Sequence, residues 1–150
     1  MCGVLRVIML FISASRYEGC KGSMIQIKRV YDPAEASDGF RYLVDRLWPR
    51  GVKKEDLPLK GWAKNLAPSD TLRRLYHSKR IGWEEFRERY ILELDADPEA
   101  WSPMAGLALR KKVTLLTATR DAKQNHALVL RDFLLRRISE LSITHSPPQA

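Results

Sequence analysis

Apolar and polar residues alternate along the chain in two patterns, which predict strands interleaved with helices. Three segments are short, rich in β-branched and aromatic residues, and either alternating or continuously apolar, as strands are. These predicted strands are 24–31, 41–48 and 113–119. In four other segments the apolar residues return every three to four positions, which is typical of amphipathic helices. These predicted helices are 69–76 with Ser69 as N-cap, 83–96, 98–111 and 124–138.

The order of these elements predicts an α/β fold. We expect a single three-layer domain with a mainly parallel sheet flanked by helices, because right-handed crossovers place helices on both faces of such a sheet. The stretch 52–69 is predicted to be irregular, with one short helical turn around Trp62.

The α/β domain is expected to span residues 24–140, because Met24 opens the first strand-like run. The polar, proline-containing end predicts a flexible tail over 141–150. Residues 1–23 are predicted to be an N-terminal extension, dispensable or disordered. The apolar stretch Val4–Ile12 within it is too short to cross a bilayer, and a signal-peptide core is the alternative interpretation.

The charge of the chain points to anionic partners. The net charge is +8 at pH 7, which favours nucleotides, phosphate esters or nucleic acid as ligands. A solvated basic surface without a ligand is the alternative. The two cysteines, Cys2 and Cys20, precede the domain, so no disulfide framework is expected and a cytoplasmic location without membrane contact is predicted. The sequence leaves the oligomeric state open.

Charged side chains lie at the carboxyl ends of the three predicted strands. In open α/β sheets, ligands bind beyond the carboxyl ends of the strands. Arginine at such a position holds phosphate or carboxylate through paired hydrogen bonds, and the next helix adds free backbone N–H groups. We therefore predict an arginine-rich anion-binding site, with structural salt bridges as the alternative. The candidate ligand-binding residues are Lys28, Arg29, Arg46, Trp48, Arg50, Arg120 and Asn125.

Three residues beside these strand ends are candidates for moving protons: Asp45, Asp121 and His126. Two alternatives remain open, namely that His126 only caps or packs at its helix and that Trp48 packs under the arginine loop. The domain contains no cysteine, and the sequence has neither a dinucleotide fingerprint nor a P-loop. No metal site is predicted, because the aspartates lack ligand spacing, and the cofactor is unknown.

Five strings of the sequence together resemble a known family. They are IKRVYDP (27–33), DGFRYLVDRLWPRGVKKE (38–55), WAKNLAPSDTLRRLYH (62–77), WEEFRERYILEL (83–94) and TLLTATRDAKQNHALVL (114–130). In this order they resemble the YeaO-like branch of the family called domain of unknown function 488, over residues 24–138. The resemblance implies a compact cytosolic α/β protein with DRLWPRG and RD…NHA as its hallmarks, and it attaches no activity to them. The chain departs from the pattern at Thr119, where alanine is expected.

These observations leave three functions open. The first is a small enzyme acting on a phosphorylated or carboxylated metabolite or nucleotide, with the arginines holding the anion. The second is a nucleic-acid-binding or regulatory module, whose mark would be a steep loss of affinity with salt. The third is a non-catalytic partner-binding protein, in which the same motifs stabilise the fold.

Overall fold

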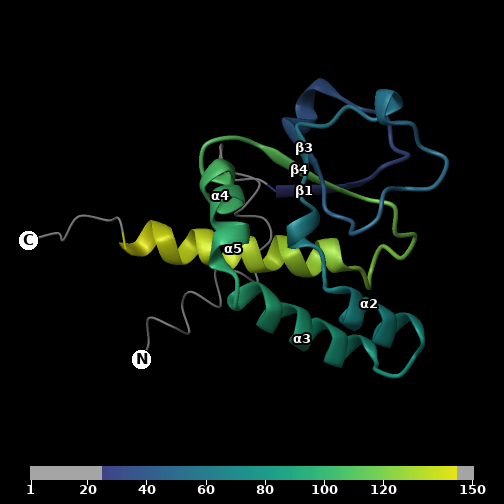
Figure 1. Cartoon of the computed structure of the whole chain (residues 1–150). Helices are drawn as coiled ribbons and strands as arrows, with labels where there is room; N and C mark the ends of the chain where they lie inside the picture. Colours follow the sequence, from purple (N-terminus) through teal and green to yellow (C-terminus); the bar gives the residue numbers. More distant parts are fainter. Residues whose placement is uncertain (1–24, 145–150) are drawn as a thin grey trace, which may run out of the picture.

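A four-stranded parallel sheet organises the fold (Figure 1). The structure is a computed structural model that describes residues 25–144, so the predictions for 1–23 and for the end of the chain after 144 lie outside it. The strands stand in the order β1-β4-β2-β3, and every neighbouring pair is parallel. Their bounds are β1 Ile25–Arg29, β2 Phe40–Leu43, β3 Gly61–Trp62 and β4 Val113–Thr117. The predicted mixed α/β fold with a parallel sheet is therefore confirmed.

Four α-helices and three short 3-10 turns complete the described residues. The helices are α2 Asp70–His77, α3 Trp83–Asp95, α4 Pro98–Ala108 and α5 His126–Thr144, and the turns are Ala36–Asp38, Lys54–Asp56 and Lys64–Leu66. Ser69 is the N-cap of α2, since its side chain accepts a hydrogen bond from the Leu72 amide. The last helix is longer than predicted and continues past residue 140 to Thr144. No helix within residues 25–144 is long and apolar enough to cross a membrane.

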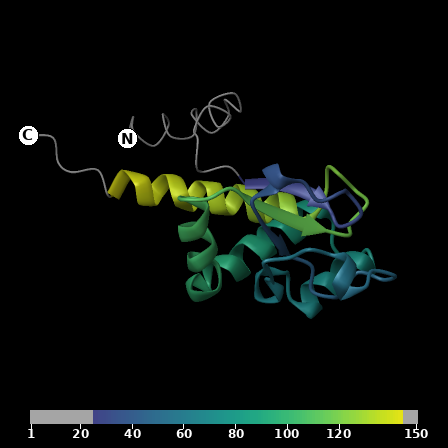
Figure 2. The same ribbon diagram turned by 90° about the horizontal axis from the view of Figure 1, so that it is seen from above.

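The two faces of the sheet are covered differently. Leu115 and Val113 of β4 point to one face, where they join a core cluster that draws residues from all four helices. In Figure 2, α5 passes behind the strands on this side. The opposite face carries a smaller cluster around Leu43 and Leu116, covered by Leu57 and its neighbouring loop. Helices therefore cover one face only, and the expected second helical layer is replaced by loops and 3-10 turns.

The second strand is shorter than the predicted 41–48. It ends at Leu43, and the Val44 amide makes one more bond, to the Leu116 carbonyl oxygen. Beyond this point Asp45 turns toward β4, where its carboxylate accepts from the Ala118 amide. The charged string that follows is therefore a loop at the carboxyl end of β2.

The region around Trp62 is a strand and not the expected helical turn. Gly61 and Trp62 pair with Tyr42 and Leu43 of β2, and the Ala63 amide bonds to the Leu43 carbonyl oxygen at 2.8 Å. A two-residue strand is too short to produce a periodic pattern, so the sequence carried no signal for it. The helical turn lies just downstream, at Lys64–Leu66.

Candidate functional site

A cleft of about 340 Å³ opens at the carboxyl ends of β2 and β4. Its walls come from the loop after β2, the loop after β4, the C-terminal half of α2 and the first turns of α3 and α5. This is where parallel α/β sheets place their ligands. Of the predicted site residues, it is lined by Asp45, Arg46, Trp48, Arg50, Asn125 and His126.

Aromatic rings form a large part of the cleft wall. Tyr76 lies 4.6 Å from Phe86 and 6.0 Å from Trp83, measured between ring centroids. Trp48 lines the cleft from the loop after β2, and its indole N–H donates to the Val52 carbonyl oxygen at 2.6 Å. Rings packed at these distances present a rigid apolar surface, on which a flat ligand group could stack.

Two arginines of the cleft converge on one carboxylate. Arg46 Nε lies 3.6 Å from Asp70 Oδ1, and Arg73 Nη2 lies 3.3 Å from the same oxygen. Both arginines line the cleft, and the Nε of Arg73 is buried without a hydrogen-bond partner among the described residues. Asp70 holds the two cations near each other and leaves most of their donors free.

The sequence analysis missed the contribution of α2. Arg73, Tyr76 and His77 all line the cleft. They are spaced i, i+3 and i+4 and so lie on one side of the helix. This spacing was visible in the sequence, but nothing in the sequence indicated that this side faces the strand ends.

Asp45 and His126 form a pair at the base of the cleft. His126 Nε2 lies 3.1 Å from Asp45 Oδ1 and 3.0 Å from the Val44 carbonyl oxygen. Both neighbours are acceptors, so Nε2 carries a proton and donates it. In the neutral imidazole, Nδ1 is then the acceptor.

The Asp45 carboxylate is also bound from β4. It accepts from the Thr117 hydroxyl at 2.7 Å and from the Ala118 amide at 2.8 Å. Burial would raise the pKa of Asp45, but the hydrogen bonds from His126, Ala118 and Thr117 outweigh it and hold the pKa below its ordinary value. Asp45 is thus an ionised anchor that ties the ends of β2 and β4 to the start of α5.

The loop after β4 uses its polar residues to start α5. Asp121 accepts from the backbone amides of Lys123 and Gln124, which lower the pKa of its carboxyl. Asn125 donates to the Asp121 carbonyl oxygen at 2.7 Å and accepts from the Leu128 amide at 3.0 Å, the bond of an N-cap. Asn125 lines the cleft, whereas Asp121 and the exposed Arg120 do not.

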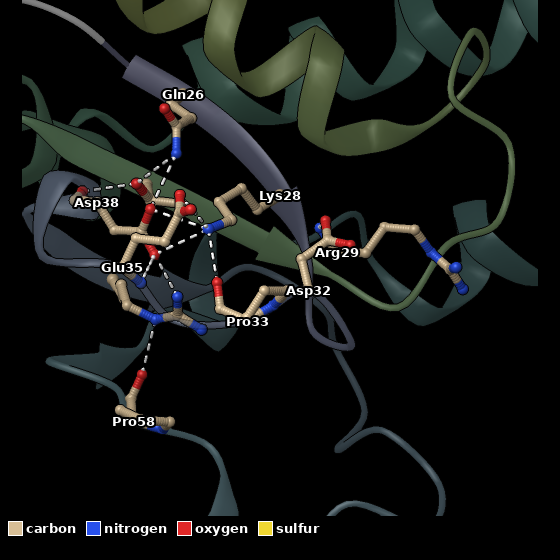
Figure 3. Close-up of polar contacts among 10 residues, drawn as sticks. Gln26, Lys28, Arg29, Asp32, Pro33, Glu35, Asp38 and Pro58 are labelled. Carbon is tan, nitrogen blue, oxygen red and sulfur yellow. Dashed lines mark hydrogen bonds and ion pairs between the residues drawn. The ribbon is translucent and has the colours of Figure 1, made fainter.

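Lys28 and Arg29 do not line the cleft, and Figure 3 shows the polar contacts of Lys28 instead. Lys28 belongs to a polar network on the second face of the sheet, where its ammonium contacts both oxygens of Asp38 at 3.0 and 3.1 Å. Arg29 extends away from this network, and its guanidinium lies 5.0 Å from the centre of the Tyr31 ring. The structure therefore does not bring the first strand end together with the other two.

Asp38 is the centre of that network and is fully buried. Besides Lys28, its carboxylate accepts from Arg41, Gln26 and the Glu35 amide. Burial would raise the pKa of Asp38, but these hydrogen bonds and the charge of Lys28 lower it to about 2. Every contact of this carboxylate is with a donor, so the network is a structural clamp between β1, β2 and the turn before β2.

Comparison with known proteins decides the family. The profile described as "Inactive DUF488-N3 subclade" matches residues 24–149. The chain belongs to the DUF488 family. Within DUF488 it is 50% identical over 110 residues to the uncharacterized protein YeaO of Escherichia coli K12, which covers 73% of this chain and 96% of that protein. This supports the YeaO-like branch that the sequence motifs indicated.

A second DUF488-like relative is more distant. The uncharacterized protein Rv3073c of Mycobacterium tuberculosis H37Rv is 41% identical over 110 residues, which cover 73% of this chain and 92% of that protein. No solved structure matches the chain significantly. Residues 25–144 hold no cluster of three or more histidine, cysteine, aspartate or glutamate side chains that could bind a metal ion.

Proposed function

We propose that this protein binds a small anionic molecule in the cleft and does not transform it. The observation that carries the proposal is the convergence of Arg46 and Arg73 on Asp70 at the aromatic-lined end of the sheet. A ligand that combines an anionic group with a flat ring, such as a nucleotide or an aromatic carboxylate, would use both features. A cytoplasmic location, which the sparse cysteines favour, belongs to the same proposal.

Asp70 supports the anion site because it positions the arginines in advance. Each contact with Asp70 uses one nitrogen of its guanidinium, and a guanidinium has five N–H donors. An incoming phosphate or carboxylate would bond to the donors of the two guanidinium groups that Asp70 does not use. Arg50, also on the cleft wall, adds a third positive charge that attracts anions into the opening.

A binding role without chemistry is favoured by the lack of an activated nucleophile. Residues 25–144 contain no cysteine. Thr119 lines the cleft, but its hydroxyl lies 3.0 Å from the Thr117 hydroxyl, and no hydrogen bond within the described chain joins it to His126. The family description, which calls the subclade inactive, agrees with this proposal.

An enzyme is the second candidate, and the pair of Asp45 and His126 is the observation that favours it. An ionised carboxylate that fixes one imidazole nitrogen leaves the other as a base. If the protein were an enzyme acting on a phosphorylated or carboxylated metabolite, His126 would be its proton acceptor. Asp121, whose carboxylate is occupied by its own loop, would have no part in it.

A thermal-shift screen of the full chain tests the binding proposal. The panel contains inorganic phosphate, phosphate monoesters, nucleoside monophosphates and aromatic carboxylates. A ligand at about 100 times its Kd stabilises the native state by about 2.7 kcal/mol, which raises Tm by roughly 5 to 10 °C for a domain of this size. We expect Arg46→Ala and Arg73→Ala to abolish this shift.

The matched control is Arg89→Ala. Arg89 is an exposed arginine on α3 that pairs with Glu85 and does not line the cleft, so this variant should keep the full shift. If no anion of the panel stabilises the protein, or if all three variants respond alike, the cleft is not an anion site. Turnover of any bound panel member, lost in His126→Asn, would favour the enzyme instead.

A further inference from the structure

A basic and aromatic surface continues from the cleft across the segment between β2 and α2. The side chains that define it are Trp48, Lys54, Trp62 and Lys64. The Lys54 ammonium lies 5.9 Å from the centre of the Trp48 ring, and the Lys64 ammonium lies 5.3 Å from the centre of the Trp62 ring. The two indoles meet edge to face at 5.5 Å. Two cation–aromatic pairs therefore stand side by side.

This surface is physically joined to the cleft. Trp48 belongs to both, because it also lines the cleft. The indole N–H of Trp62 donates to the Asp45 carbonyl oxygen at 2.7 Å, so the second ring is anchored to the loop that carries Arg46. A ligand long enough to leave the cleft beside Trp48 would meet Trp62 next.

The lysines of the surface are free to meet a partner. Lys54 and Lys64 form no ion pair with any described residue, whereas Lys28 and Arg41 are tied to Asp38. Both lysines are exposed, and Trp62 is 37% exposed. The segment thus presents positive charge together with accessible ring surface. Glu55 and Asp56, in the same turn as Lys54, offset part of this charge.

We propose that single-stranded nucleic acid binds along this surface and places one of its phosphates between Arg46 and Arg73. Single-strand binding sites combine cations that follow the phosphates with aromatic rings on which unpaired bases stack. Bases in a duplex are already stacked and cannot use such rings. The inference rests on the proposed function, because one phosphate of the strand would occupy the anion site that Arg46 and Arg73 form.

The test is fluorescence anisotropy of a labelled single-stranded 12-mer of mixed sequence, titrated with the full chain at several salt concentrations. Each phosphate contact contributes a slope of about −0.7 in a plot of log K against log salt for a single strand. We expect the double variant Lys54→Ala/Lys64→Ala to reduce the steepness of the slope by about 1.4, for two phosphate contacts. Arg46→Ala/Arg73→Ala should reduce it by about 0.7, because these two arginines share one phosphate. An unlabelled duplex of the same sequence should compete at least tenfold more weakly than the single strand.

The charge-matched control is Arg110→Ala/Lys111→Ala. Both residues are exposed, follow α4 and precede β4, at the amino end of the sheet and away from the cleft. This variant should keep the wild-type slope. A slope that falls equally in the control, or equal competition by the duplex, would overturn the inference by showing diffuse attraction to net charge.

The two proposals fail in different ways. If nucleoside monophosphates stabilise the protein through Arg46 and Arg73 but the 12-mer binds no more tightly than they do, the cleft takes a free small molecule and the nucleic-acid inference is wrong. If neither the 12-mer nor any small anion binds, both proposals are wrong.

Discussion

Replacing Asp38 with asparagine should strongly destabilise the protein. The Asp38→Asn side chain has nearly the same shape, but it puts an NH₂ group where only donors converge, from Gln26, Lys28, Arg41 and the Glu35 amide. It also leaves the buried Arg41 and the mostly buried Lys28 without their shared negative charge.

The expected loss of stability follows from the burial of Asp38 and its ion pairs. Breaking a buried ion pair by removing one partner costs about 3 to 5 kcal/mol, because the remaining charge stays buried and uncompensated. Total stability of a domain is about 5 to 15 kcal/mol, so the variant should retain a marginal fold. With a urea m-value of about 2 kcal/mol/M, the unfolding midpoint should fall by roughly 2 M.

Urea unfolding at pH 7, followed by tryptophan fluorescence, measures this loss. Asp132→Asn is the matched control, because Asp132 pairs with Arg131 on the exposed side of α5 and surface pairs contribute about 0 to 1 kcal/mol. If Asp38→Asn cost no more than the control, the network would not clamp the second face of the sheet, and the reasoning from burial would be refuted.

Two further predictions concern stability. The pKa of Asp38 in the folded protein is about 2, below the ordinary value of about 3.9. Its contribution to the free energy of unfolding is therefore complete above about pH 4 and is lost as pH falls through 2. The free energy of unfolding, measured from pH 5 to pH 2, should drop steeply in the wild type and less in Asp38→Asn. Gly39→Ala should cost about 2 to 5 kcal/mol, since φ is 68° and a Cβ would lie 2.3 Å from the Lys112 carbonyl oxygen. In contrast, Gly51→Ala, with φ 75° and nothing within 4 Å, should cost only about 1 kcal/mol of backbone strain; equal losses in the two thermal melts would contradict this account.

Much of the fold was predictable because its elements carry strong local patterns. The fully buried β4 reads as a run of apolar and β-branched residues, and its central position in the sheet explains why. Ser69 was identified as an N-cap from its residue type and position. The pattern could not show that all helices lie on one face, because amphipathicity indicates that a helix has a buried side and not which face of the sheet it covers.

The candidate site was predictable in part, from the rule that ligands of α/β sheets bind beyond the carboxyl ends of the strands. That rule placed Asp45, Arg46 and His126 near each other, and they do line one cleft. It failed to separate them from Lys28, whose ammonium is occupied by Asp38 on the second face of the sheet. Residue spacing does not reveal that Asp38, ten residues further along the chain in a turn, would take up the Lys28 ammonium. The cleft face of α2, including Arg73, depends on tertiary packing and carried no local signal of its role.

The most direct test of the central claim is an NMR titration of the full chain, observed at the indole N–H groups of its four tryptophans. Trp48 and Trp83 line the cleft, while Trp101 packs against Phe133 away from it. With inorganic phosphate and a nucleoside monophosphate as probes, and signals assigned by single Trp→Phe variants, we predict saturable shifts at Trp48 and Trp83 and none at Trp101. The shifts should vanish in Arg46→Ala/Arg73→Ala. Unmoved cleft signals, or shifts of equal size at Trp101, would contradict an anion site in this cleft.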